Sequence, residues 1–383
     1  MVGYLLRRWA QMGVTFVAFL GLVFLLIQAQ PGDYTQVYTL DPNIPPESRR
    51  AIAAAFGLDR PVWQQFFVYL GNFFRGDLGV SFEHYPRSVM SVIMERLPRT
   101  LILFLTATVI AFYLGFVLGK LIAWRRGRAV EYVFTISGVY LYTVFTPWFA
   151  LVLMWLFAIK LDWLPVGKFI TPELWVRSSV DSNYVFVRLL VTAAAGSALF
   201  LALAVLLSRL RVPRAGLVLA GAGAASCGLA VLGWGLSGYG PLALDIAEHI
   251  ALPILVLTLI SFAGTMLLTR NSMLETMRED YVFAARARGL PDNMVRDRYV
   301  ARNALLPVVT SFVFSLAFAI DGGVITETIF SWPGMGLTLL NAAVVEDIPL
   351  AVGAFVFTGV FVLVAHLVAD VLYAFLDPRI RYR

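Results

Sequence analysis

The side chains that most often carry chemistry are few and dispersed in this chain. Its three histidines, His84, His249 and His366, are separated from one another by more than 100 residues. Neither an HExxH pattern nor cysteines at ligand spacing accompany them, and the single cysteine, Cys227, has no disulfide partner. We therefore predict no catalytic residue and no metal site in this chain.

The segment from Gly115 to Lys120 resembles a phosphate-binding loop only in part. It has three residues between its glycines where that loop has four, and no Ser or Thr follows its lysine. It also falls in a stretch apolar enough to cross a membrane. We expect the chain to bind no nucleotide and to need no cofactor of its own.

The elements that must position any function are membrane helices. The chain has 383 residues, of which 60% are hydrophobic and 14% charged. Charged residues leave eight stretches of 18 residues or more, and about twenty apolar residues in a helix cross a bilayer. The stretches are 9–32, 100–119, 132–159, 189–208, 215–244, 250–269, 303–320 and 348–369. They predict an all-α, polytopic integral membrane protein with about eight transmembrane helices.

The basic residues predict the orientation of these helices. With the N-terminus inside, the inner connections hold 19 of the 30 Lys and Arg residues, and the short outer connections hold four. The remaining seven lie in 33–99, a segment long enough to escape the charge rule. We expect both termini in the cytoplasm. The basic residues show no pattern typical of nucleic-acid binding, so we expect no nucleic-acid partner.

A polar, arginine-rich segment around residues 278–291 separates two of the apolar stretches. Asp280 can cap a helix there, Gly289 can end it, and Pro291 discourages its continuation. Ala284 and Ala285 would leave this helix thin on one side. It could rest on anionic lipid, or it could dock a partner protein.

Ionisable residues inside the apolar stretches bear on how such a protein is energised. The strongest candidate for a buried group that couples transport to an ion is Asp321. It either lines a hydrophilic pathway or pairs with a polar group nearby. A secondary transporter would need more such groups and usually an internal repeat. We therefore expect the energy to come from another protein, received at the helix near residue 280.

Several motifs, taken in order, resemble those of the permeases of ATP-binding-cassette (ABC) importers. The resemblance is to the oligopeptide, dipeptide and nickel group, and within it to the first, B-type, permease of the pair. Residues 281–291, continued by Arg302 to Val308, are similar to the coupling loop of that family. Residues 57–63, 76–79 and 95–98 resemble its outer lobe, residues 327–336 its last outer loop, and residues 370–382 its C-terminus. Phe283 stands where the wider superfamily often has Glu.

The resemblance implies a permease that forms half of a transmembrane pathway and itself binds no nucleotide. Its implied partners are a second permease, two ATPases that hold ATP and Mg²⁺, an extracytoplasmic solute-binding protein and membrane lipid. Contact with an ATPase would be made by seven residues. They are Asp280, Phe283, Ala284, Ala285, Arg286, Arg288 and Gly289.

The family normally has six spans, so the resemblance predicts an inserted hairpin. The expected parts are an N-terminal helix (1–30), an extracytoplasmic lobe (31–99), two helices (100–165), an insertion with two extra helices (166–243) and a core (244–383) with the coupling loop 270–305. Peptides are the expected substrate. Oligosaccharide, glutathione and nickel are alternatives, as are a secondary transporter and a regulatory scaffold.

Overall fold

The computed structural model describes residues 2–28, 61–176, 178, 180–210, 215–318 and 323–376. Within those ranges the secondary structure is helical, apart from one antiparallel bridge between Val80 and Ser88. The chain forms two compact units. One holds residues 1–150, 254–329 and 333–383, and the other holds residues 151–253 and 330–332.

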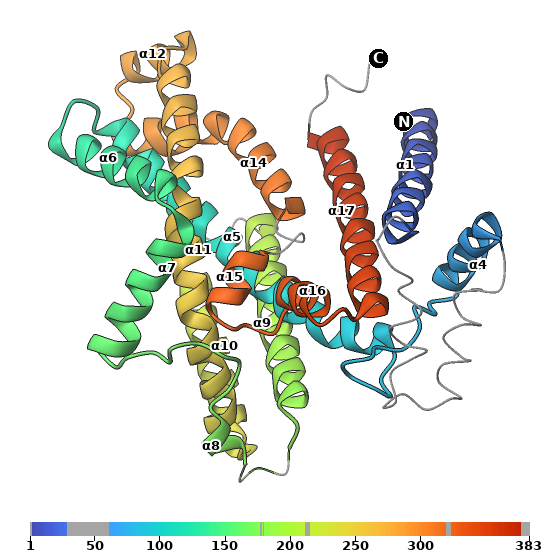
Figure 1. Ribbon diagram of the computed structural model, residues 1–383. Coiled ribbons are helices and arrows are strands. Elements are labelled where there is room, and N and C mark those ends of the chain that lie inside the picture. The colour runs from blue at the N-terminus through green and yellow to red at the C-terminus, as the bar shows by residue number, and fades with distance from the viewer. Residues whose placement is uncertain are drawn as a thin grey trace. The chain divides into compact units, whose positions relative to one another are not determined.

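Within the described ranges, seven helices are long and apolar enough to cross a membrane (Figure 1). They are α1 (Val2–Gln28), α5 (Val89–Trp124), α9 (Ser182–Leu210), α10 (Ala215–Leu236), α11 (Gly240–Thr276), α14 (Ala301–Phe318) with the short α13 (Asp292–Met294) and η2 (Val295–Val300) before it, and α17 (Ile348–Leu376). The shorter helices are α4 (Val62–Phe74), α8 (Pro172–Trp175), α12 (Asp280–Ala287), α15 (Val324–Ile329) and α16 (Met335–Val344). The all-α membrane fold predicted from the sequence is confirmed.

The predicted span at 132–159 is broken. Two helices, α6 (Ala129–Thr143) and α7 (Thr146–Met154), the latter continued by η1 (Trp155–Lys160), meet at a bend of 106°. Pro147 lies in the first turn of α7; it has no N–H, and its ring would clash with the carbonyl of Thr143 in a continuous helix. The eight predicted spans are therefore seven continuous helices and one broken pair.

Two glycines bring α5 and α11 into close contact within the first unit. A Cβ atom on Gly115 would lie 2.5 Å from the carbonyl oxygen of Phe262, and one on Gly119 would lie 2.5 Å from that of Met266. Small residues four apart let two helix backbones approach in this way. The segment that resembles a phosphate loop therefore packs one membrane helix against another.

Gly119→Ala is expected to destabilise the protein by about 1–3 kcal/mol, because a methyl group there must push the α11 backbone away. The matched control is Gly221→Ala in α10, where a Cβ atom would meet nothing within 4 Å. Both changes carry the same gain in helix propensity, so their difference isolates the clash. Thermal unfolding in detergent measures it. Equal melting temperatures for the two variants would show that α5 and α11 tolerate separation.

Helix α4 joins a hydrophobic cluster with α1 and α17. Phe66 and Leu70 pack with Leu20, Val23 and Val356. Tyr69 and Phe73 also belong to this cluster, whereas Trp63, Phe67 and Phe74 lie outside it and are exposed. The helix is thus fastened to the spans by one side only.

In the second unit, a buried carboxylate fastens α8 to α11. Asp245 accepts hydrogen bonds from Thr171 Oγ1 at 2.6 Å and from Trp175 Nε1 at 2.7 Å. His249, one turn further along α11, is also buried and lies beside Asp245. In α10, by contrast, a Cβ atom on Gly216 or Gly228 would meet nothing within 4 Å.

Candidate functional site

Helix α12 lies beside the end of α11, at one end of the first unit (Figure 1). Its predicted N-cap is wrong by one residue: Glu279 holds that position, with an extended backbone, and Asp280 is the first helical residue. Asp280 still places a negative charge at the positive end of the helix dipole. Gly289 ends the helix with a φ of +73°, and its N–H donates to the carbonyl of Arg286 at 2.9 Å.

One face of α12 is buried against the rest of the first unit. Val282 and Ala285 are 1% and 0% exposed and pack against Met273 at the end of α11 and against Val300 in η2. The Tyr281 hydroxyl accepts a hydrogen bond from Asn303 Nδ2 at 2.9 Å, which ties the helix to α14. Helix α12 is thus fixed to two spans and can transmit force to them.

The opposite face of α12 is exposed to solvent. It carries Asp280, Phe283, Ala284 and Ala287, at spacings that place them on one side of a helix. Phe283 is 77% exposed, which is unusual for a large apolar side chain on a polar helix. We name these four residues the α12 outer face.

The structure separates the two alanines that we expected to act together. Ala284 lies on the α12 outer face, whereas Ala285 is buried in this chain and cannot touch a partner while α12 stays packed. Ala285 therefore contributes by seating the helix.

The two arginines of the segment contact their own chain. The Arg286 guanidinium lies over the Trp124 ring, 5.6 Å from its centroid, and Arg288 Nε donates to the Ala284 carbonyl at 3.2 Å. Both side chains are nevertheless exposed. That they also pair with acids on a partner stays a prediction.

A buried acid holds the neighbouring connection between α5 and α6. Glu131 accepts from Arg270 Nε at 2.9 Å and from the Gly127 N–H at 2.6 Å, and Arg270 Nη2 makes a further short contact with it. Arg270 belongs to α11, so this bridge ties the turn after α5 to α11. The end of the first unit that carries α12 is therefore cross-linked rather than loose.

Asp321, the predicted pathway residue, lies outside the described residues. The sequence did not single out another acid, Glu327 of α15, which is fully buried. Glu327 accepts from Thr100 Oγ1 at 2.7 Å and from the Leu337 N–H at 2.9 Å. The Thr100 hydroxyl oxygen in turn accepts from the Met335 N–H at 2.7 Å. One carboxylate and one hydroxyl thus hold the start of α16 to α15 and α5.

Burial raises the pKa of the Glu327 carboxyl above its ordinary value, and the hydrogen bonds from Leu337, Thr100 and Gly336 offset part of that rise. The only sequence signal at this position was its place in the segment 327–336, which resembles a loop of the importer permeases. The pairing with Thr100, 227 residues away, gives no local pattern.

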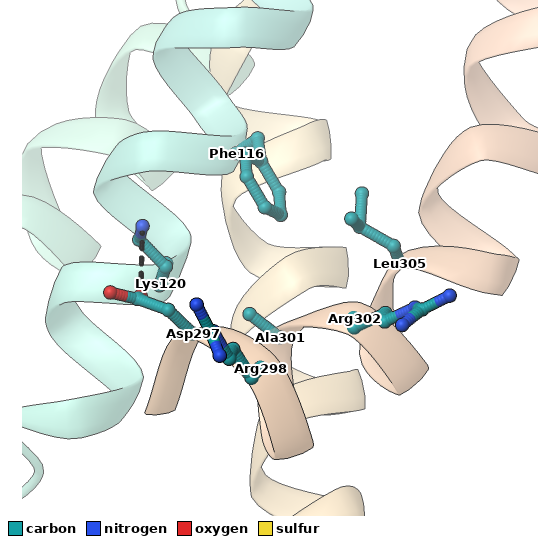
Figure 2. A pocket seen from close by; sticks show the side chains of 7 residues that line it. All are labelled: Phe116, Lys120, Asp297, Arg298, Ala301, Arg302 and Leu305. Atoms are coloured by element: carbon teal, nitrogen blue, oxygen red, sulfur yellow. Dashed lines mark ion pairs between the residues drawn. The ribbon is translucent and has the colours of Figure 1, made fainter. Parts of the chain in front are cut away.

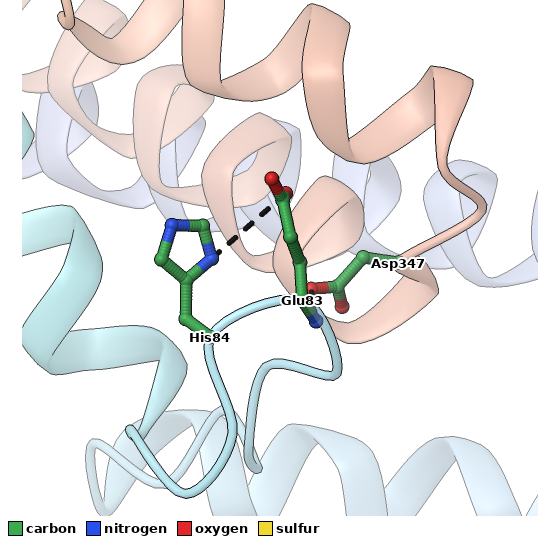
Figure 3. A group of neighbouring side chains, drawn as sticks. All are labelled: Glu83, His84 and Asp347. Atoms are coloured by element: carbon green, nitrogen blue, oxygen red, sulfur yellow. Dashed lines mark hydrogen bonds and ion pairs between the residues drawn. The ribbon is translucent and has the colours of Figure 1, made fainter. Parts of the chain in front are cut away.

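Glu83, His84 and Asp347 form a second cluster, drawn in Figure 3, whose possible ligand atoms lie within 4.8 Å of one another. Asp347 is 1% exposed. Its Oδ2 accepts from Ser81 Oγ at 2.6 Å and from the backbone N–H groups of Phe82 and Glu83 at 3.0 and 3.1 Å. Because this oxygen already accepts three hydrogen bonds, we interpret the cluster as a structural contact that fastens the loop at residues 81–83 to the start of α17.

Two protein families match this chain. The family described as "Binding-protein-dependent transport system inner membrane component" matches residues 115–382. The family described as "Binding-prot-dependent transport system membrane comp, N-term" matches residues 1–104. Together the matches cover both ends of the chain and nearly everything between them.

Individual relatives align over their full length. The oligopeptide transport system permease protein AppB of Bacillus subtilis (strain 168) is 29% identical over 382 residues, covering 100% of both chains. The di/tripeptide transport system permease protein DppB of Pseudomonas aeruginosa (strain UCBPP-PA14) is 30% identical over 385 residues, again with 100% of both covered. The dipeptide transport system permease protein DppB of Escherichia coli (strain K12) is 30% identical over 386 residues, with the same coverage.

Proposed function

Because the chain belongs to the family of inner membrane components of binding-protein-dependent transport systems, we propose that it forms half of a transmembrane pathway for peptides and receives the energy for transport at α12. As a member of this family it is a multi-pass protein of the cell membrane and a transport subunit. The peptide substrate and the role of α12 are the parts we infer.

The names of the relatives support peptides as the substrate. The three relatives above are named for oligopeptide, di/tripeptide and dipeptide transport, and each is matched over its whole length. A fragment match could reflect a shared fold alone, whereas end-to-end similarity includes the parts that meet substrate.

The α12 outer face is the observation that carries the energising role. Apart from Asp280 it is a small apolar surface, on a helix whose other face is fixed to α11 and α14. A partner that grips Phe283 and Ala284 can therefore pull on two spans at once. We propose that two ATPases close on ATP and shift this helix, while a second permease chain completes the pathway and a solute-binding protein delivers the peptide.

This role requires that α12 and both termini lie on the cytoplasmic side of the membrane. The excess of basic residues in the expected inner connections supports it. Figure 1 also has the start of α1, the helix α12 and the end of α17, all in the first unit, at the same end of the view. A cysteine-accessibility assay at residue 284 tests this orientation directly.

The function is tested by reconstituting the chain with its co-purifying subunits in vesicles. Labelled di- to octapeptides are offered outside, together with the binding protein, and ATP is enclosed inside. We expect uptake that needs ATP and is competed by unlabelled peptide. Uptake of oligosaccharide, glutathione or Ni²⁺ in place of peptide would contradict the substrate and leave the importer class intact.

Two results would contradict the importer class itself. Uptake driven by a proton or sodium gradient without ATP would indicate a secondary transporter. A lone homo-oligomer without ATPase subunits and without transport would indicate a regulatory or scaffolding role.

A further inference from the structure

An open pocket of about 560 Å³ lies between α5 and the segment that leads through η2 into α14 (Figure 2). Its lining combines three basic side chains, one acid and an apolar wall. The lining residues are Phe116, Lys120, Asp297, Arg298, Ala301, Arg302 and Leu305. None of the seven residues expected to contact an ATPase lines this pocket.

The polar part of the lining carries an excess of positive charge. Lys120 Nζ lies 3.2 Å from Asp297 Oδ1, and Arg296, just outside the pocket, donates to both oxygens of Asp297 at 2.9 and 2.8 Å. Asp297 is therefore already neutralised. Among the described residues, Arg298 and Arg302 have no ion-pair or hydrogen-bond partner. Three cations against one anion leave the lining at +2.

The remaining part of the lining is apolar. Phe116 from α5 and Leu305 from α14 stand on two sides of the pocket in Figure 2, and Ala301 lies at its floor near the basic residues. The pocket sits where these helices leave the apolar core, because α5 ends at Trp124, one turn beyond Lys120, and charged residues precede α14. Basic groups beside an apolar wall at a membrane boundary match a phosphate headgroup with its acyl chains.

We propose that this pocket binds an anionic phospholipid. The phosphate is held by Arg298 and Arg302, Lys120 adds charge from α5, and the acyl chain follows Phe116 and Leu305 toward the bilayer core. Ala301 also belongs to the cluster that seats α12, so a bound lipid would brace η2 against α5 beside the α12 seat. The proposal rests on the membrane location of the family and does not depend on peptide transport.

The test uses the full chain, purified and depleted of lipid, and measures its affinity for phosphatidylglycerol and for phosphatidylcholine of the same chain length. Each basic residue near an anionic membrane surface strengthens binding by roughly fivefold. Because Arg298 and Arg302 each contribute about this factor, we expect phosphatidylglycerol to bind about 25-fold more tightly than phosphatidylcholine. In the variant Arg298→Gln/Arg302→Gln the preference should fall to about twofold or less.

The matched control is Arg278→Gln/Arg288→Gln, which removes the same charge from exposed positions outside the pocket. It should keep the preference of about 25-fold. All four altered residues are exposed, so neither double variant should change the melting temperature. Equal affinity for the two lipids, or an unchanged preference in the first variant, overturns the proposal. Equally tight binding of glycerol 3-phosphate would point to a soluble phosphate instead. Loss of the preference on assembly with the other subunits would make the pocket a subunit interface.

Discussion

Replacing Phe283 with alanine is expected to lower substrate-stimulated ATP hydrolysis by the assembled transporter roughly ten- to hundredfold. Phe283 is 77% exposed in this chain, so its side chain can be buried by a partner. Full burial of a phenylalanine contributes about 1.5–3 kcal/mol, and 1.4 kcal/mol is a factor of ten in affinity. The loss should be largest at low ATPase-subunit concentration, since docking is what weakens.

Phe283→Leu is the matched control, because it keeps most of the apolar surface and should keep most of the activity. Neither variant should lower the melting temperature of the isolated chain, since an exposed side chain contributes little to its stability. If Phe283→Ala kept the affinity of the wild-type chain for the ATPase subunit and its ATP hydrolysis rate, the partner would not bind the α12 outer face. Ala284→Trp tests the same face by adding bulk.

The structure also changes which substitutions test docking. From the sequence alone, Ala285→Trp and Gly289→Trp look like suitable probes. Ala285 is fully buried against α11 and η2, so tryptophan there would unseat the helix. Gly289 has a φ of +73°, which strains any other residue. Both changes would abolish coupling for internal reasons, with no information about a partner.

The sequence predicted the spans well because membrane helices are set by composition. A run without charge needs no tertiary contact to be recognised, and Gly289 ends α12 by its own backbone freedom. The break between α6 and α7 was missed, because the length of an uncharged run does not indicate whether the helix that it forms is continuous. Pro147 was the available signal.

Packing was less predictable because it joins residues that are distant in sequence. Gly115 and Gly119 drew attention as a partial phosphate loop, and only the position of α11 identifies them as a helix contact. The same holds for Ala285, whose exposure depends on the placement of η2. Periodicity could assign Phe283 and Ala285 to different faces, but it could not say which face is covered.

Glu327→Ala is expected to destabilise the chain by about 3–5 kcal/mol, the largest stability effect we predict. The substitution leaves the N–H groups of Leu337 and Gly336 and the Thr100 hydroxyl without their acceptor in a buried site. Each unsatisfied group costs about 1–3 kcal/mol, and removing one member of a buried charged network costs a similar total. Thermal unfolding in detergent measures the loss as a fall in melting temperature of roughly 4–6 °C.

Two further variants separate the network from simple loss of volume. Glu327→Gln keeps the shape and one acceptor oxygen, but its NH₂ group faces a donor, so it should recover only part of the stability. Thr100→Val combined with Glu327→Ala should cost less than the two single changes added together, because both act on one network. Strict additivity, or full stability in Glu327→Ala, would contradict the assignment. Gly334 must stay small for the same reason, since a Cβ atom there would collide with both Glu327 and Thr100, and the start of α16 would leave α5.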